Sequence, residues 1–231
     1  VISDKLVTSK DAMFGVIGEP SMMEIIPAHK GAGGAHVMIH GKAAHSSRPE
    51  LGVNAIQKSA DFLVELRGLQ EKLNKTQHSL LGPTTVECTI INGGFKENII
   101  PDQSQLALNF RFIPGHEAPK TSKKWLNNII KKLSVKDPDF NAEIIDHRAS
   151  IPLDVPLDSP VVEILKDILG SEPVGAPYYT EAVSYTSAGI PTVICGPGSI
   201  DQAHTPDEYI SLEQMEQGVA TYKELIKRVC L

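Results

Sequence analysis

His45 lies in the stretch HGKAAHSSRPELGVNAI, where alanine and serine residues leave space around its ring. No cysteine, second histidine at ligand spacing or carboxylate triad accompanies it there, as a local metal cluster or nucleophile pair would require. An imidazole near neutral pH can donate one hydrogen bond and accept another. Two interpretations stay open: a functional hydrogen-bond donor, or a loop histidine bonded to its serine neighbours.

A second set of candidates follows two apolar segments that lie far apart in the chain. Glu19 comes after MFGVIG, and His204 lies in GPGSIDQAHTPDE, after IPTVIC. Ligands gather at the carboxyl ends of strands in open α/β sheets, so we expect both at one sheet edge. Carboxylate oxygen and imidazole nitrogen both suit zinc, and Asp207 or Glu208 could ligate or orient His204. Two ligands do not make a zinc site. The alternative is a turn at Glu19 and a histidine bonded within its own loop.

The middle of the chain has the periodicity of a β-α-β-β-α-β unit. Alternation of apolar and polar residues predicts four strands, at 33–43, 84–93, 103–113 and 141–148. Helical spacing predicts two helices, one over 53–73 and one that contains Trp125, Ile129 and Leu133. In this split βαβ pattern, two helices cover one face of the sheet and leave the other free.

The alternation also predicts which residues share a face of this sheet. One face is expected to carry the apolar residues Val86, Cys88, Ile90, Leu106, Leu108, Phe110 and Phe112. The free face is expected to carry the polar residues Glu87, Asn109 and Arg111, with His36 and His40 as further candidates. A solvated sheet surface is the simplest interpretation of such a face.

The two ends of the chain have the pattern of a separate α/β domain. Short apolar runs that end in glycine and proline predict central strands, and SPVVEILKDILG and SLEQMEQGVATYKELIKRV predict helices. Ser211 and Gln214 have capping-box spacing at the start of the last helix. The predicted fold is α/β: a helix-covered mixed sheet from residues 1–30 and 150–231, with an inserted βαββαβ ferredoxin-like domain at 31–149.

Composition excludes several classes of function. The 231 residues are 41% hydrophobic and 22% charged, with a net charge of −6, which argues against nucleic-acid or membrane-surface binding. No apolar run approaches the roughly 18 residues of a membrane span. The odd set Cys88, Cys195 and Cys230 indicates free thiols in a reducing compartment, so the cytoplasm is expected. The absence of an initiator methionine suggests a piece of a longer chain.

Six motifs occur in the order seen in the acetylornithine deacetylase / succinyl-diaminopimelate desuccinylase family of dinuclear zinc hydrolases. They are GEPS with AHKG, GKAAHSSRPELGVNAI, ENIIPD, LNFRF, YYTEAVSY and CGPGSIDQAHTPDEYI. The chain resembles this family from Gly18 to its last helix. The resemblance implies zinc-dependent removal of an acyl group from an N-acyl amino acid, with cobalt as a possible substitute. It also implies a catalytic domain with an inserted lid that forms a homodimer.

Carried over by position, the resemblance assigns roles to the candidates. Glu19 and His204 resemble terminal ligands of two different zinc ions. His45 resembles a residue that crosses the dimer interface and donates a hydrogen bond to the oxyanion formed at the other subunit's zincs. Arg111 and Asn98 resemble lid residues that hold the carboxylate or acyl end of the substrate.

Two further positions match the loop that cradles the substrate. These are Thr180 in YTEA and Gly198 in GPGS. Lys30 in AHKG lies near the hinge, where a solvated structural role and substrate contact are both open.

The chain departs from the family in one large respect. No H-x-D motif and no Glu-Glu pair precedes GEP, so part of the family's ligand set and its general base are missing. We expect the isolated chain neither to hold two zincs nor to hydrolyse acylated amino acids. N-acetylornithine is the first candidate substrate, ahead of N-succinyl-diaminopimelate or another N-acyl amino acid. A non-catalytic dimerisation or binding module is the alternative if the chain is complete.

Overall fold

The computed structural model describes residues 7–116, 118–203 and 205–231. The chain divides into two compact units, each with its own hydrophobic core. We call residues 30–151 the inserted unit, and residues up to 29 together with 152–231 the end unit. Among the described residues, no helix combines the length and apolar character needed to cross a membrane.

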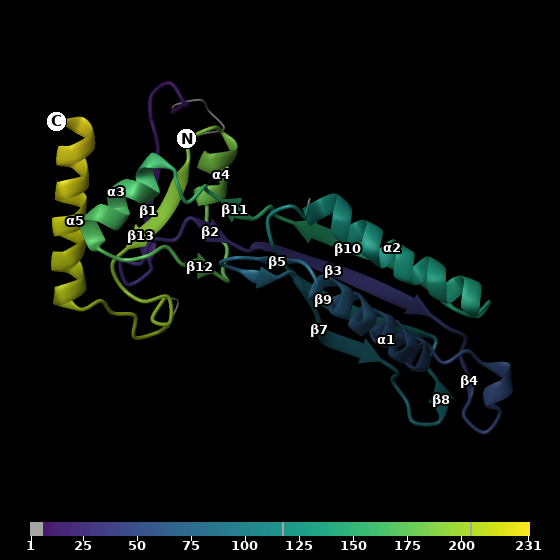
Figure 1. The fold of residues 1–231 in the computed structure, drawn as a ribbon. Helices are drawn as coiled ribbons and strands as arrows, with labels where there is room; N and C mark the ends of the chain where they lie inside the picture. Colours follow the sequence, from purple (N-terminus) through teal and green to yellow (C-terminus); the bar gives the residue numbers. More distant parts are fainter. Residues whose placement is uncertain (1–6, 117, 204) are drawn as a thin grey trace. The chain divides into compact units, whose positions relative to one another are not determined.

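The inserted unit has the predicted βαββαβ order. Its main elements are β3 (Gly31–His40), α1 (Ala55–Leu73), β7 (Thr85–Gly93), β9 (Gln103–Phe112), α2 (Ala118–Lys136) and β10 (Asn141–Ala149). The strands form one antiparallel sheet in the order β10-β3-β9-β7. Both helices cover the same face of this sheet (Figure 1). The remaining elements of the unit are short: β4 (Ala44–His45), η1 (Pro49–Leu51), β5 (Gln77–His78), β6 (Gly82–Pro83) and β8 (Ile99–Ile100).

The pairing of β3 with β9 fixes the two faces of the sheet. These strands pair without a register shift from Gly31↔Phe112 to His40↔Gln103. The apolar residues predicted on β9 are buried against the helices, whereas Asn109 and Arg111 lie on the open face. Gly33 faces the core, where a Cβ atom would lie 2.7 Å from the Phe112 ring. Glycine is therefore required there for the phenylalanine to pack.

One predicted face assignment is wrong. Ile90 was expected to share the core face with Val86 and Cys88, but its side chain is 56% exposed. The register of β7 shifts between Cys88 and Ile90, which is a β-bulge. A bulge adds one residue to the strand and reverses the alternation after it, so the simple period of two fails here.

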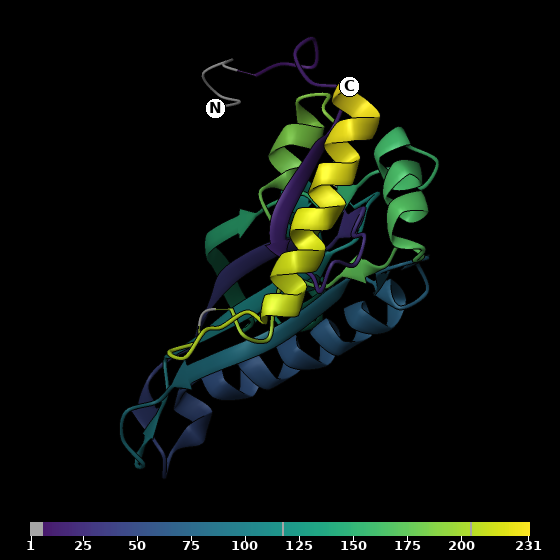
Figure 2. The same cartoon turned by 90° about the vertical axis from the view of Figure 1, so that its left-hand side faces the viewer.

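The end unit contains β1 (Gly15–Pro20), β2 (Ala28–His29), β11 (Leu153–Asp154), α3 (Pro160–Leu169), β12 (Gly175–Ala176), α4 (Ala182–Ser187), β13 (Thr192–Gly196) and α5 (Leu212–Cys230). The strands β1 and β13 are parallel neighbours, and β11, β2 and β12 form a second small sheet. Figure 1 places α3 and α5 on one side of the β1–β13 pair and α4 on the other; Figure 2 shows α5 running along β1.

Capping residues explain where the helices α3 and α5 begin or end. The helix α3 starts with Pro160 and ends at Gly170, whose φ of 64° is a left-handed cap. The Ser211 side chain caps α5 by accepting a hydrogen bond from the Gln214 N–H at 3.2 Å, as the sequence predicted.

Cys195 on β13 is fully buried, and burial raises the pKa of its thiol to about 11, so it stays a neutral, unreactive thiol at neutral pH.

Two half-buried histidines of the inserted unit connect the region of α2 to the sheet. His116 Nδ1 lies 2.7 Å from Thr84 Oγ1, and the ring meets Trp125 edge-on at 5.3 Å. His147 Nε2 lies 2.8 Å from Ser122 Oγ. Burial lowers the pKa of both imidazoles below the usual 6.5. The folded chain therefore favours their neutral forms.

We expect the stability of the inserted unit to fall as the pH falls from about 7 to 5. The unfolded chain binds more protons than the folded chain just below pH 6.5, because the folded pKa values lie lower. The free energy of unfolding is measured by urea denaturation at each pH. Replacing both rings (His116→Gln with His147→Gln) should make its fall between pH 7 and pH 5 smaller, by up to about 1 kcal/mol, since the rings are only half-buried. His45→Gln, which changes an exposed ring, is the control. An unchanged slope in the double variant would contradict the assignment.

Candidate functional site

His45 and Asn98 meet at the tip of the inserted unit, although 53 positions separate them. The strand β4 pairs with β8, with His45 opposite Ile99. The backbone N–H of Ser46 donates to the Asn98 carbonyl oxygen at 3.0 Å. Both side chains are exposed. The structure therefore brings these two predicted residues together.

Close backbone contacts hold this tip in place. Lys42 and Val53 exchange two backbone hydrogen bonds, at 2.8 and 2.9 Å. A Cβ atom at Gly41 would lie 2.1 Å from the Val53 carbonyl oxygen, and one at Gly52 would lie 2.9 Å from the Ala44 Cβ. Any larger residue at these two positions would push the chain apart, so the glycines allow the loop to fold back beside His45.

The neutral tautomer of His45 follows from its bonds to Ser47. The backbone N–H of Ser47 donates to His45 Nδ1 at 3.2 Å, and the Ser47 hydroxyl lies 2.7 Å from the same nitrogen. A backbone N–H can only donate, so Nδ1 is an acceptor and the ring hydrogen is on Nε2. The serine bond that the sequence left as an alternative is present, and it leaves an exposed ring that presents Nε2–H as a donor.

Arg111 lies far from this tip on the open face of the sheet. Arg111 on β9 pairs with Ala32 on β3 and with Thr85 on β7. The tip follows the other end of β3, where His40 pairs with Gln103. From Gln103 to Arg111 the strand extends by about 27 Å at 3.4 Å per residue. Within one chain, Arg111 is therefore not brought together with His45 and Asn98.

Lys30 lies near Arg111 and is held by the backbone. Its Nζ donates to the Pro83 carbonyl oxygen at 2.7 Å. Burial, and then the positive charge of Arg111, lower the pKa of the Lys30 amine. The two cations thus repel one another at this end of the sheet, and Lys30 is a half-buried, hydrogen-bonded residue.

Glu19 and Gly198 meet at the carboxyl edge of the β1–β13 pair in the end unit. Pro20 pairs with Gly196, and a Cβ atom at Gly196 would lie only 2.4 Å from the backbone of the opposite strand. The backbone N–H of Met22 donates to the Gly198 carbonyl oxygen at 2.7 Å. The expectation that these distant segments share one edge is correct for the residues that the structure describes.

A groove of about 250 Å³ opens beside this edge. Its lining residues are Pro20, Ser21, Met22, Glu24, Ile26, Gly175, Ala176, Pro177, Tyr178, Ser199 and Ile200. The Tyr178 hydroxyl donates to the Pro20 carbonyl oxygen at 3.4 Å. Burial raises the pKa of Tyr178, and the negative charges of Glu19 and Glu24 raise it further. The two carboxylates give this groove a negative field, which favours a cationic group.

Thr180 is buried and serves the local structure. Its Oγ1 accepts a hydrogen bond from the Ala182 N–H at 3.2 Å at the start of α4. Its own N–H donates to Nε2 of the fully buried His29 at 3.3 Å, and the His29 ring meets Tyr179 edge-on at 5.4 Å.

The sequence reasoning did not single out His29, Glu24 or Tyr178. The sequence pointed to these residues only through the motifs AHKG, GEPS and YYTEA, which contain or closely precede them. Gln214 was also missed as a partner of Gly198: its Oε1 accepts a hydrogen bond from the Gly198 N–H at 3.2 Å. Only the folded chain brings the last helix to that glycine.

The described residues do not form a complete metal site. His204, predicted as a zinc ligand, lies outside the described residues. Asp207 and Glu208 are exposed in the loop before α5. Across 7–116, 118–203 and 205–231, no group of three or more histidine, cysteine or acidic side chains is arranged to hold a metal ion. Of the two predicted zinc ligands, Glu19 is the one that lies among the described residues.

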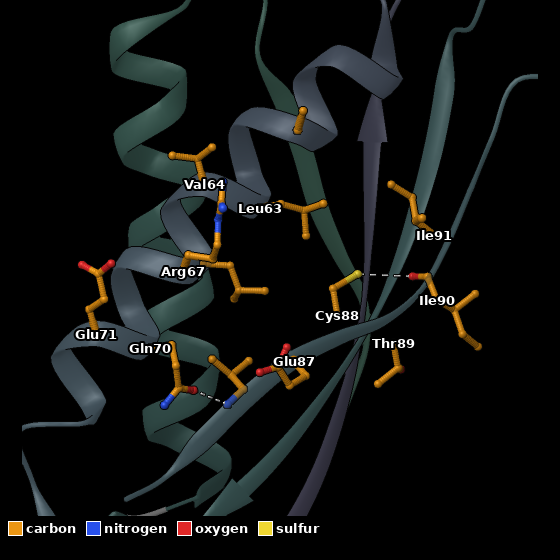
Figure 3. A pocket seen from close by; sticks show the side chains of 13 residues that line it. Leu63, Val64, Arg67, Gln70, Glu71, Glu87, Cys88, Thr89, Ile90 and Ile91 are labelled. Atoms are coloured by element: carbon orange, nitrogen blue, oxygen red, sulfur yellow. Dashed lines mark hydrogen bonds between the residues drawn. The ribbon is translucent and has the colours of Figure 1, made fainter.

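A larger groove of about 710 Å³ runs between α1 and β7 on the inserted unit (Figure 3). Leu63 and Val64 line it from the helix, and Cys88, Ile90 and Ile91 line it from the strand. Because β7 is the last strand of the sheet, its outer backbone edge is unpaired. Gln70 ties the two elements together by accepting a hydrogen bond from the Val86 N–H at 2.7 Å. An apolar groove beside an open strand edge is typical of a protein interface.

Comparison with solved structures agrees with this architecture. An aminopeptidase PepT from Bacillus cereus superposes with a TM-score of 0.78 at 21% identity, covering 100% of this chain and 61% of that one. An M20 family metallo-carboxypeptidase from Sulfolobus solfataricus gives a TM-score of 0.65 at 19% identity, covering 94% of this chain and 62% of that one. At these identities, the likeness shows the fold.

Sequence comparison identifies relatives of the chain. Residues 27–138 match the peptidase dimerisation domain. An acetylornithine deacetylase from Proteus mirabilis is 32% identical over 222 residues, which cover 94% of this chain. The match covers 57% of that protein, so the chain spans less than three fifths of the relative's length. The chain therefore contains a peptidase dimerisation domain and is related over nearly its whole length to the acetylornithine deacetylases.

Proposed function

We propose that the protein acts within an M20 amidohydrolase that removes the acyl group from an N-acyl amino acid, with N-acetylornithine as the first candidate. The observation that carries this proposal is the state of His45: an exposed ring whose Nε2–H is fixed as a donor by Ser47. Attack on an amide carbonyl puts negative charge on its oxygen, and a positioned N–H donor stabilises that charge. The 32% identity to an acetylornithine deacetylase supports the substrate class.

The remaining candidate residues would bind different parts of the substrate. The Arg111 guanidinium suits a carboxylate, which it can bind with two parallel hydrogen bonds. Asn98 accompanies His45 at the tip, so both would contact the acyl end. Gly198 and Thr180 would line the substrate loop, next to the negative groove at Glu19. Glu19 and His204 remain candidates for zinc ligands of the larger enzyme, and the described part of this chain does not complete such a site.

A homodimer accounts for the distance between Arg111 and His45. A small acyl amino acid cannot reach both across about 27 Å of extended strand. If one substrate uses both, they come from different subunits. The α1–β7 groove also suits a second copy of this chain, because two β7 edges can pair about a twofold axis into one continuous sheet. Val64, Ile90 and Ile91, at 55%, 56% and 47% exposure, would then be covered.

Localisation and metal follow from this proposal. An enzyme that uses small amino-acid substrates and carries free thiols fits the cytoplasm. A zinc pair is the cofactor that we propose for the whole enzyme, with cobalt as a substitute. N-succinyl-diaminopimelate or another N-acyl amino acid remains the second choice of substrate, since a few pocket contacts decide between them.

Replacing His45 by alanine in the full-length enzyme should lower kcat by about 10²–10³-fold, as for other oxyanion donors. The fold should be unchanged, because the side chain is exposed. Ser47→Ala should give a smaller loss, since the backbone N–H that keeps Nδ1 an acceptor remains and only the hydroxyl contact to the ring is removed. Mixing the His45→Ala and Glu19→Ala enzymes should restore part of the activity through heterodimers. Failure to restore activity at any mixing ratio would refute the cross-subunit role.

A charge in the α1–β7 groove should break the dimer. We expect Ile91→Lys to shift the protein to monomer in sedimentation velocity, because burying an unpaired ammonium costs several kcal/mol. Val135→Lys is the matched control, since Val135 is 79% exposed on α2, outside this groove. A dimer that persists in the Ile91 variant, or is lost equally in the control, places the interface elsewhere.

The isolated 231-residue chain should hold fewer than two zinc ions and show no deacetylase activity. The described residues supply no three-donor cluster, which tight zinc binding needs. The measurement is metal content after dialysis, together with acetate release from N-acetylornithine. Two tightly bound zincs per chain would contradict this expectation. A well-folded dimer that is inactive even when the relatives' remaining segment is supplied would favour a non-catalytic binding module.

A further inference from the structure

One face of α5 follows the chain from the end of β13 into the loop after it. Three residues of the helix, spaced by four, lie against this segment: Tyr222 against Cys195, Gly218 against Pro197 and Gln214 against Gly198. The Tyr222 hydroxyl donates to the cysteine carbonyl oxygen at 2.6 Å, and a Cβ atom at Gly218 would lie 3.1 Å from the proline Cγ. Residues four apart share one helix face, so the start of α5 is built to contact this loop.

Gln214 does not use its side chain as a capping box predicts. Half of the box is present, because Ser211 Oγ accepts a hydrogen bond from the Gln214 N–H. In the other half, the glutamine side chain would accept from the Ser211 N–H. Among the described residues, Gln214 Oε1 instead accepts from the Gly198 N–H at 3.2 Å, 16 positions away in the chain. The side chain therefore supports the loop and not its own helix.

Gly198 is buried, and both of its backbone polar groups depend on distant partners. Its carbonyl oxygen accepts from the Met22 N–H at 2.7 Å, and its N–H donates to Gln214. Its φ of 89° is open to glycine and rarely to other residues. A buried N–H that loses its acceptor is unfavourable, so without Gln214 this loop would reorganise until the N–H reached water.

The loop that Gln214 supports forms part of the groove beside Glu19. Ser199 and Ile200 follow Gly198 directly and line this groove, and Met22 lines it from the other segment. The hydrogen bond between Met22 and Gly198 joins the two segments. Gln214 does not line the groove, so its influence on the groove passes through the loop.

We propose that Gln214 is a positioning residue, which holds the loop 197–200 in the shape that binds substrate without touching the substrate. The inference rests on the proposed function for the role of this loop. A loop that contacts the substrate away from the reacting amide contributes equally to the ground state and the transition state. Loss of Gln214 should therefore weaken substrate binding and leave the chemical step unchanged.

The first measurement is amide hydrogen exchange of the 231-residue chain by NMR, which needs no activity. Gln214→Met keeps the length of the side chain and removes its strong acceptor, so protection of the Gly198 and Met22 amides should fall about tenfold. Gln214→Glu keeps an acceptor and should retain this protection. The Val193 and Ile194 amides on β13 should stay protected in both variants, which shows that the end unit is folded.

Gln57→Met is the matched control. Gln57 has the same place in α1, three positions after the cap, where the Asn54 side chain accepts from its N–H at 3.2 Å. Its side chain is exposed and belongs to the other unit, so the Gly198 amide should not respond.

The second measurement is steady-state hydrolysis of N-acetylornithine by the full-length enzyme. Gln214→Met should raise KM about three- to tenfold with kcat changed by less than about twofold, and Gln214→Glu should restore KM. Unchanged Gly198 protection in Gln214→Met, an equal loss in Gln214→Glu or Gln57→Met, or a fall in kcat at constant KM would each overturn the proposal. If the enzyme hydrolyses no N-acyl amino acid, the proposed function fails, and the exchange measurement still decides whether Gln214 holds the loop.

Discussion

The antiparallel pairing of β3 with β9 is the constraint on which the inserted unit depends. Ten consecutive residues of each strand pair without a bulge, so the core face and the open face alternate along both strands. A slip of one residue would move Phe110 and Phe112 to the open face and Arg111 into the core. Gly33 enforces the register, because the Phe112 ring occupies the space of its missing side chain.

Because this register is fixed, the sheet separates two kinds of chemistry. Its covered face buries the apolar side chains against α1 and α2. Its open face carries Arg111, Asn109 and Arg148. The far end of β3 leads into the tip that presents His45. One sheet thus carries cationic groups at one end and leads to the donor His45 at the other.

At the edge of the end unit, hydrogen bonds hold two strained residues in place. Met22 and Met23 have φ values of 54° and 60°, in the left-handed region that costs non-glycine residues about 1–3 kcal/mol each. Hydrogen bonds to the carbonyl oxygens of Gly198 and Gly196 hold them there, at 2.7 and 2.9 Å. Strain of this kind persists where the surrounding structure requires it, here beside Glu19 and the groove at Tyr178.

The sequence by itself determined the periodic and local features of this protein. Alternation along β9 predicted its buried residues and placed Arg111 on the open face, and the motifs around His45 and Glu19 predicted the family. Tertiary structure alone decided the bulge that exposes Ile90, the tautomer of His45 and the bond from Gly198 to Gln214. The physical reason is range: periodicity reports on neighbours along one element, whereas these features depend on contacts between strands and loops distant in the chain.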